Sequence, residues 1–142
     1  MTRVAVLGGG PAGGSAALAL ARGGAAVDLY LPARPGEKPC GGAVPEHILP
    51  QIDGFDPSPL PAVVSPEALL ENARGHRLAL DLEGVRIFRR RDFDRALVEA
   101  ALAAGAAPRR IKAERLEGVE RGVRVIAGGE ERTYDWVVGA DG

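Results

Sequence analysis

A glycine-rich turn lies directly between an apolar run and an alanine-rich stretch near the start of the chain. The run Val4–Leu7 leads into Gly8, Gly10 and Gly13 with the spacing G-x-G-x-x-G, and alanines follow at once. A buried strand, a tight turn and a helix N-terminus together form a pyrophosphate cradle, because backbone N–H groups and the positive helix end face the phosphates. This context makes the motif informative, since a ligand-free turn does not need glycine at all three positions.

The following residues extend the motif into a βαβ unit over residues 1–31. The apolar spacing predicts a helix over residues 12–23, and Val27–Leu31 predicts the second strand. Pro11 lies inside the glycine turn, which suits a phosphate-binding turn better than a continuous helix.

The second strand lacks the acidic residue that dinucleotide-binding units usually carry at its end. That residue lies about 20 positions beyond the glycines and accepts hydrogen bonds from the adenosine ribose. Leu31 occupies the position here, so Arg34 or Glu37 would have to replace the contact. We therefore expect nucleotide binding with reduced affinity.

Composition excludes several classes of function. The 18 basic and 19 acidic residues give a net charge of -1, which offers no electrostatic basis for binding nucleic acid. The single cysteine, Cys40, excludes an internal disulfide and fits a reducing compartment. His47 and His76 are too isolated to form a metal site. With neither a signal peptide nor an apolar run of about 18 residues, we expect a soluble, cytoplasmic protein.

The middle of the chain changes character. Prolines punctuate residues 32–76, which predicts loops with one short helix around residues 45–48. Residues 77–82 and 85–88 alternate about Glu83-Gly84, which predicts a hairpin.

The last third of the chain predicts a helix, a meander and a returning strand. Apolar residues at helical spacing place the helix over residues 92–104. Strands are expected near residues 111–116, 123–127 and 130–134, within an inserted region that spans residues 77–135. The apolar run 136–140 predicts a buried parallel strand, and residues 136–142 end in Asp141-Gly142. The fold class is therefore α/β, with a parallel sheet (residues 3–7, 27–31 and 136–140) and an antiparallel β-meander.

Three separated segments resemble one flavoprotein group, which contains the geranylgeranyl reductases. They are the glycine turn, the segment Lys38–Gly42, and Arg90–Asp94 together with the closing Val137–Gly142. Aromatic hydroxylases of the para-hydroxybenzoate hydroxylase type and flavin-dependent halogenases are the wider relatives. The resemblance implies a Rossmann-like (GR2-type) FAD-binding domain. It also implies a truncated chain, because such proteins run to several hundred residues.

The resemblance implies an FAD site and a reductant, NAD(P)H or another electron donor. With Arg34 added for the ribose, the expected cofactor-binding residues are Gly8, Gly10, Pro11, Ala12, Gly13, Arg34, Cys40, Gly41, Gly42, Arg90, Asp141 and Gly142. Cys40 is also the expected catalytic residue. Each of the three polar positions has an alternative: Cys40 as a small buried hydrophobe, Arg90 as part of a solvated arginine run, and Asp141 as a helix cap.

The implied function is the FAD-binding portion of an oxidoreductase that reduces alkenes of an isoprenoid or similar apolar substrate. A flavin-dependent monooxygenase or a halogenase relative is the alternative within the same group. A non-catalytic remnant with weak or no nucleotide binding, and a plain NAD-dependent dehydrogenase, also stay open. Membrane association is expected only through a lipid substrate, and a homo-oligomer would cover exposed sheet surface.

Overall fold

A four-stranded parallel sheet forms the centre of the fold, and its strand order is β10-β1-β2-β6. The computed structural model describes residues 1–33 and 39–142. The strands are β1 (Arg3–Leu7), β2 (Ala26–Tyr30), β6 (Ala107–Arg109) and β10 (Trp136–Gly139). The three strands predicted from the sequence are confirmed, and the short β6 adds a fourth at the edge.

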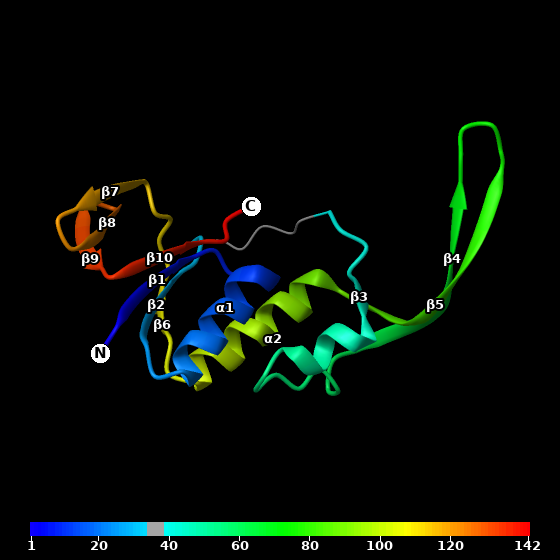
Figure 1. The fold of residues 1–142 in the computed structure, drawn as a ribbon, viewed down its shortest axis with the longest axis horizontal. Helices are drawn as coiled ribbons and strands as arrows, with labels where there is room; N and C mark the ends of the chain where they lie inside the picture. Colours follow the sequence, from blue (N-terminus) through cyan, green and yellow to red (C-terminus); the bar gives the residue numbers. More distant parts are fainter. Residues whose placement is uncertain (34–38) are drawn as a thin grey trace.

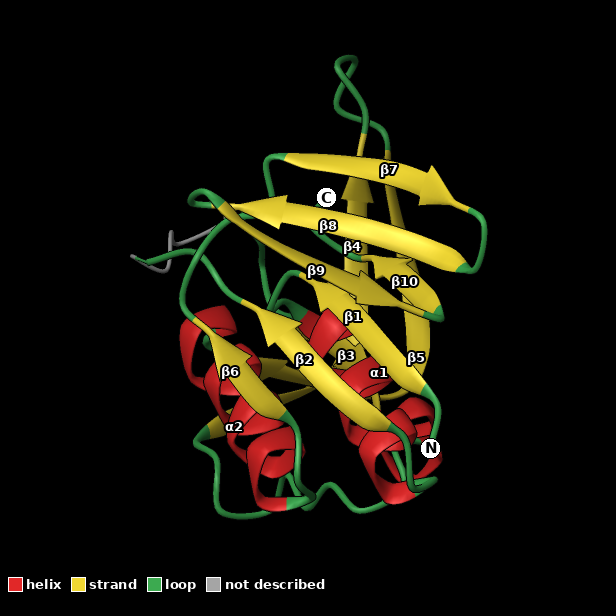
Figure 2. Ribbon diagram, turned by 90° about the vertical axis from the view of Figure 1, so that its left-hand side faces the viewer, coloured by secondary structure: helices red, strands yellow, loops and turns green. Residues whose placement is uncertain are grey.

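Two helices cover one face of this sheet (Figure 2). They are α1 (Pro11–Arg22) and α2 (Arg90–Ala103), close to the bounds that the apolar spacing predicts. The face is apolar because side chains alternate along a strand. Val4, Val6 and Leu29 point into this layer and pack against Leu18 and Ala101.

The antiparallel meander covers the other face. It consists of β7 (Arg115–Val119), β8 (Gly122–Ala127) and β9 (Glu130–Tyr134). Alternate residues of the central strands, Ala5, Leu7 and Tyr30, pack against Val125 and Tyr134 of this meander. The parallel sheet is thus buried on both faces, as its near-continuous apolar strands require.

A second antiparallel sheet lies beyond the helices and extends into a long arm (Figure 1). Its strand order is β3-β5-β4, with bounds β3 (Ala43–Pro45), β4 (Ala62–Glu71) and β5 (Arg77–Phe88). The short helix η1 (Glu46–Gln51) follows β3. Leu49, Phe88, Phe93 and Leu97 join this sheet to α2 in a buried cluster.

One face of the β4–β5 arm is apolar and exposed. The register pairs Ala68 with Leu80 and Leu70 with Leu78, so these four side chains share a face. Leu70 and Leu78 are 54% and 56% exposed.

The hairpin predicted within residues 77–88 is wrong, because these residues form one strand. Three residues, 82–84, stand opposite Pro66, where the register of β4 and β5 shifts. Proline cannot donate to the ladder, and Gly84 adopts φ +68°, so the predicted turn is instead a bulge.

The loop predicted over residues 32–76 is also wrong in part. The ten-residue strand β4 lies inside it, although η1 matches the short helix expected near residues 45–48. The strand expected at residues 111–116 is displaced to β7, and β6 lies before it. Within the described ranges, the helices fall short of what a membrane span requires in length and apolar character.

Candidate functional site

The glycine turn lies at the carboxyl end of β1, wedged between neighbouring strands. Gly8 has φ +112°, and a Cβ there would overlap the carbonyl of Ala140. A Cβ on Gly13 would overlap the carbonyl oxygen of Gly8. The Gly8 N–H donates to the carbonyl of Tyr30 over 2.9 Å, which fixes the turn against the end of β2. Close backbone packing therefore requires glycine at both positions.

The N-terminus of α1 is open for an anion. Its N-cap is Gly10, which supplies no side-chain hydrogen bond, and no acidic residue lies in the first turn. The first N–H groups of the helix, including those of Ala12 and Gly13, and the positive dipole end are therefore left for a ligand. Pro11 at the first helical position has no N–H to satisfy.

The Cys40 loop is tied to the end of β5 by Gly42. The Phe88 N–H donates to the Gly42 carbonyl over 3.0 Å. Gly42 has φ +72°, and a Cβ there would overlap the Phe88 carbonyl, so no other residue fits without a shift. Gly41 meets no neighbour that a Cβ would touch. This attachment brings Cys40 next to Arg90, which opens the following helix.

The Cys40 thiol is exposed and activated by its neighbours. The pKa of Cys40 is lowered chiefly by the N–H of Gly42, which donates to Sγ over 3.5 Å, and next by the guanidinium of Arg90. Both groups stabilise the thiolate, the nucleophilic form of cysteine. The alternative of Cys40 as a small buried hydrophobe is wrong, because its side chain is exposed.

Arg90 is fixed in place by Asp94. Two hydrogen bonds of 3.1 Å join Nε and Nη2 to the two carboxylate oxygens, and the side chains are only 16% and 24% exposed. The hydrogen bonds to the Asp94 carboxylate raise the pKa of Arg90 above its ordinary value. A smaller contribution in the same direction comes from Cys40. Nη2 lies 4.0 Å from the position that a Cβ on Gly10 would take. Arg90 therefore faces the glycine turn. The alternative that it belongs to a solvated run of arginines does not describe this side chain.

The chain returns to the glycine turn at Asp141. The Ala140 N–H donates to the Leu7 carbonyl over 2.9 Å. The Cα of Asp141 lies 3.0 Å from the position of a Cβ on Gly8. Asp141 and Gly142 are exposed beside the turn.

Leu31 is buried where an acidic residue would meet the ribose. It is 8% exposed, and a Cβ on Gly9 would clash with its Cδ2. Its N–H donates to the carbonyl of Arg109 over 2.8 Å. Arg34 and Glu37, the two proposed substitutes, lie outside the described residues, so the ribose contact stays a prediction.

The structure thus brings Arg90 and Asp141 next to the glycine turn and Cys40 next to Arg90, while Arg34 lies outside the described residues. The sequence analysis did not identify Asp94 as the partner of Arg90. The signal was present, because residues four positions apart on a helix lie on the same face. Asp28 and Tyr134 were also missed; they meet on the meander face through a hydrogen bond of 2.6 Å. No clear sequence signal joins those two residues, which lie in distant strands.

Comparison with known proteins gives one family and a consistent set of relatives. The sequence profile of the pyridine nucleotide-disulphide oxidoreductases matches residues 2–138. The chloroplastic geranylgeranyl diphosphate reductase of Oryza sativa subsp. japonica is 36% identical over 99% of this chain and 34% of its own length. The chain therefore spans about a third of that relative.

Solved structures share the fold. A geranylgeranyl bacteriochlorophyll reductase-like protein from Thermoplasma acidophilum has a TM-score of 0.80 with 24% identity, over 99% of this chain and 39% of that one. Halogenase PltM, solved in complex with phloroglucinol and FAD, has a TM-score of 0.76 with 19% identity, over 98% of this chain and 34% of that one.

Proposed function

Because this chain belongs to the pyridine nucleotide-disulphide oxidoreductase family and is related to geranylgeranyl reductases, we propose that it binds the pyrophosphate of FAD. The observation that carries this proposal is the start of α1, which directly follows the glycine turn and has neither a side-chain cap nor an acidic first turn. Gly8 and Gly13 allow the tight turn that precedes it, because a Cβ on either would overlap backbone atoms. The N–H groups and the positive dipole end of the helix are thereby left for a pyrophosphate.

The residues around the turn would act by position and charge. Arg90, held by Asp94, places a permanent cation beside Gly10, where it would stabilise negative charge on a bound cofactor. Cys40 lies beside Arg90 and presents an exposed thiol whose pKa is lowered. Bound FAD supplies hydride transfer, and the chain supplies orientation and electrostatics.

The proposed reaction of the parent protein is alkene reduction on an isoprenoid or similar apolar substrate. The support is the Pro39–Gly42 segment and the relatives named as geranylgeranyl diphosphate reductases. NAD(P)H or another donor would act as reductant. A cytoplasmic location, and membrane contact only through a lipid substrate, belong to the same proposal. A flavin-dependent monooxygenase or a halogenase relative is the alternative, and its support is the fold shared with halogenase PltM.

A flavin-binding measurement on the 142-residue chain tests the proposal. Purified protein is mixed with FAD and desalted, and its visible spectrum is compared with a titration of flavin fluorescence. We expect saturable quenching, and about ten- to hundredfold weaker binding in Arg90→Gln, because a charge-assisted hydrogen bond contributes about 1.5–3 kcal/mol. Arg91→Gln, an exposed neighbour on the same helix, is the matched control.

Two outcomes would contradict the proposal. A wild-type chain without saturable quenching would favour the non-catalytic alternative, with Leu31 in place of the ribose acid as the physical reason. Equal losses in Arg90→Gln and Arg91→Gln would show that the arginine acts only through overall charge. If flavin is retained, bleaching by NAD(P)H tests the reductant, and reduction of an isoprenoid alkene by the parent protein separates the reductase from the monooxygenase.

A further inference from the structure

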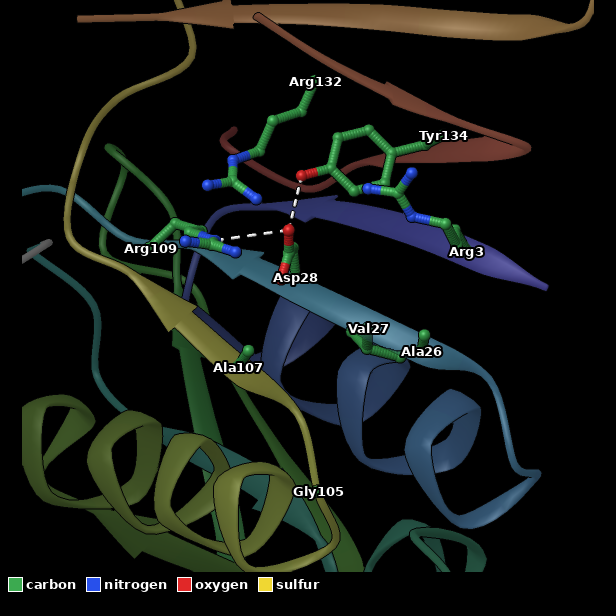
Figure 3. Close-up of a pocket in the computed structure, with 9 residues that line it drawn as sticks. All are labelled: Arg3, Ala26, Val27, Asp28, Gly105, Ala107, Arg109, Arg132 and Tyr134. Atoms are coloured by element: carbon green, nitrogen blue, oxygen red, sulfur yellow. Dashed lines mark hydrogen bonds and ion pairs between the residues drawn. The ribbon is translucent and has the colours of Figure 1, made fainter. Parts of the chain in front are cut away.

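A cavity of about 220 Å³ lies between the parallel sheet and the meander, away from the glycine turn. It is lined by the start of β1, by β2, by the segment around β6 and by β9 (Figure 3). Three arginines line it: Arg3, Arg109 and Arg132. Asp28 is the one carboxylate among its lining residues. The wall therefore carries a surplus of positive charge.

Asp28 is already engaged by other groups. Its Oδ2 accepts a hydrogen bond of 2.6 Å from the Tyr134 hydroxyl and lies 3.2 Å from Nε of Arg109. Tyr134 in turn contacts the hydroxyl of Tyr30 at 2.8 Å. Asp28 therefore offsets the charge of Arg109. It does not offset the charges of Arg3 and Arg132.

The remaining arginines are weakly compensated. The Arg3 guanidinium lies 5.4 Å from the centre of the Tyr134 ring, a cation–π contact that keeps the full charge. Arg132 pairs with Glu130 at 3.4 Å, but that carboxylate side chain is 72% exposed, so water screens the pair. Asp135 accepts from the backbone N–H of Arg3 rather than from its guanidinium.

Arg109 lies on a wall that the cavity shares with a second one. Its Nε is buried and lies 3.2 Å from Oδ2 of Asp28. Arg109 and Arg132 also line a neighbouring cavity of about 290 Å³, together with Arg110. The side chains of Arg109 and Arg132 thus line both cavities.

From these observations we infer that the cavity binds a small oxyanion, a phosphate or phosphate-ester group, between Arg109 and Arg132 with Arg3 on the far side of Tyr134 (Figure 3). Planar guanidinium groups bind phosphate through paired N–H donors. The volume is below the roughly 300–1,000 Å³ of sites for drug-sized ligands, which favours a small group. The site is separate from the glycine turn and does not depend on flavin binding.

The test is a nuclear magnetic resonance titration of the 142-residue chain with inorganic phosphate, at constant ionic strength. We expect saturable shifts of the Arg109 Nε–H and of the Asp28 and Ala107 amides. Arg132→Gln should weaken binding about tenfold, since it removes a charge-assisted contact. Glycerol 3-phosphate is titrated in parallel, and the tighter of the two ligands identifies a free or an esterified phosphate as the source.

Two control variants make the result specific. Arg121→Gln lies in the β7–β8 turn and is not among the lining residues, so its affinity should equal that of the wild type. Arg90→Gln reports phosphate bound at the glycine turn and should leave the shifts around Arg109 unchanged. Shifts that chloride reproduces, shifts that do not saturate, or an Arg132→Gln affinity equal to the wild type would overturn the inference.

Discussion

Asp94 holds Arg90 by two parallel hydrogen bonds, from Nε to Oδ1 and from Nη2 to Oδ2, each 3.1 Å long. The two residues are four positions apart on the first turns of α2, and both are largely shielded from water. A guanidinium held in this way loses little freedom when it meets a further partner. The guanidinium of Arg90 is therefore held in position beside the glycine turn before any ligand binds.

Arg90→Gln should slow the alkylation of Cys40. Arg90 lowers the pKa of this thiol, second to the N–H of Gly42, so its removal raises the pKa and reduces the thiolate fraction. The rate below the pKa falls about tenfold for each unit of that rise. Iodoacetamide labelling from pH 6 to pH 10 measures the effect. Arg91→Gln is the control, and an unchanged pH profile in Arg90→Gln would rule out the assigned contact.

Gly13→Ala should destabilise the fold by about 2 kcal/mol or more, because its Cβ would overlap the Gly8 carbonyl, which is backbone. Gly118→Ala in β7 meets no atom within 4 Å and should change stability by about 0.5 kcal/mol or less. Urea unfolding of both variants provides the comparison. Equal stability of the two would show that the turn relaxes freely.

Tyr134→Phe should remove a pH-dependent part of the stability. Burial, and then the hydrogen bond to Asp28, raise the pKa of Tyr134, so the folded state keeps the proton. This stability is complete below the unfolded pKa of about 10 and declines as the pH rises above it. At pH 7 the variant should lose about 1–3 kcal/mol, since the Asp28 carboxylate, which is only 14% exposed, loses a donor.

Urea unfolding of both proteins at pH 7 and pH 10.5 checks the Tyr134 prediction. The wild type should lose more stability between the two pH values than Tyr134→Phe does. Parallel curves would mean that the hydroxyl ionises as easily in the folded chain as in the unfolded one.

Replacing Leu70 and Leu78 together by serine should leave the core intact. Both side chains lie on the exposed apolar face of the β4–β5 arm, so their loss should change stability by about 0.5 kcal/mol or less for each residue. Binding of the dye ANS and self-association should both fall, because the apolar patch is interrupted. Sedimentation velocity measures the second effect.

Leu97→Ala provides the matched contrast for the arm. Leu97 is fully buried against Phe93, and its truncation should cost about 2–5 kcal/mol. If the arm variant costs as much, its apolar face is covered in solution.

The sequence predicted the elements whose signals are local. Val4–Leu7 and the glycines that follow define β1 and the start of α1 because one strand and one turn contain the whole pattern. The neighbourhood of β1 and β2 agrees with the rule that parallel strands joined by a single helix commonly lie side by side, whereas no local signal indicates that β10 pairs with β1.

The errors arise where residues distant in the sequence determine the local structure. Glu83-Gly84 has the composition of a turn, but its place opposite Pro66 makes it a bulge. The true turn between β4 and β5 is built by Asn72, whose side chain accepts from the N–H groups of Arg74 and His76. β6 has only three residues and includes Pro108, so it carries no periodic signal.

The pairing of β1 with β10 also sets an order of events during synthesis. Val4 stands opposite Trp136, so the neighbour of the first strand is made 132 residues later in the chain. The unit from β1 to β2 contains only local connections and forms early, whereas closing so long a loop is slow. One edge of β1 is thus without its partner on the ribosome until β10 emerges, and the nascent chain is most open to misassociation along that edge.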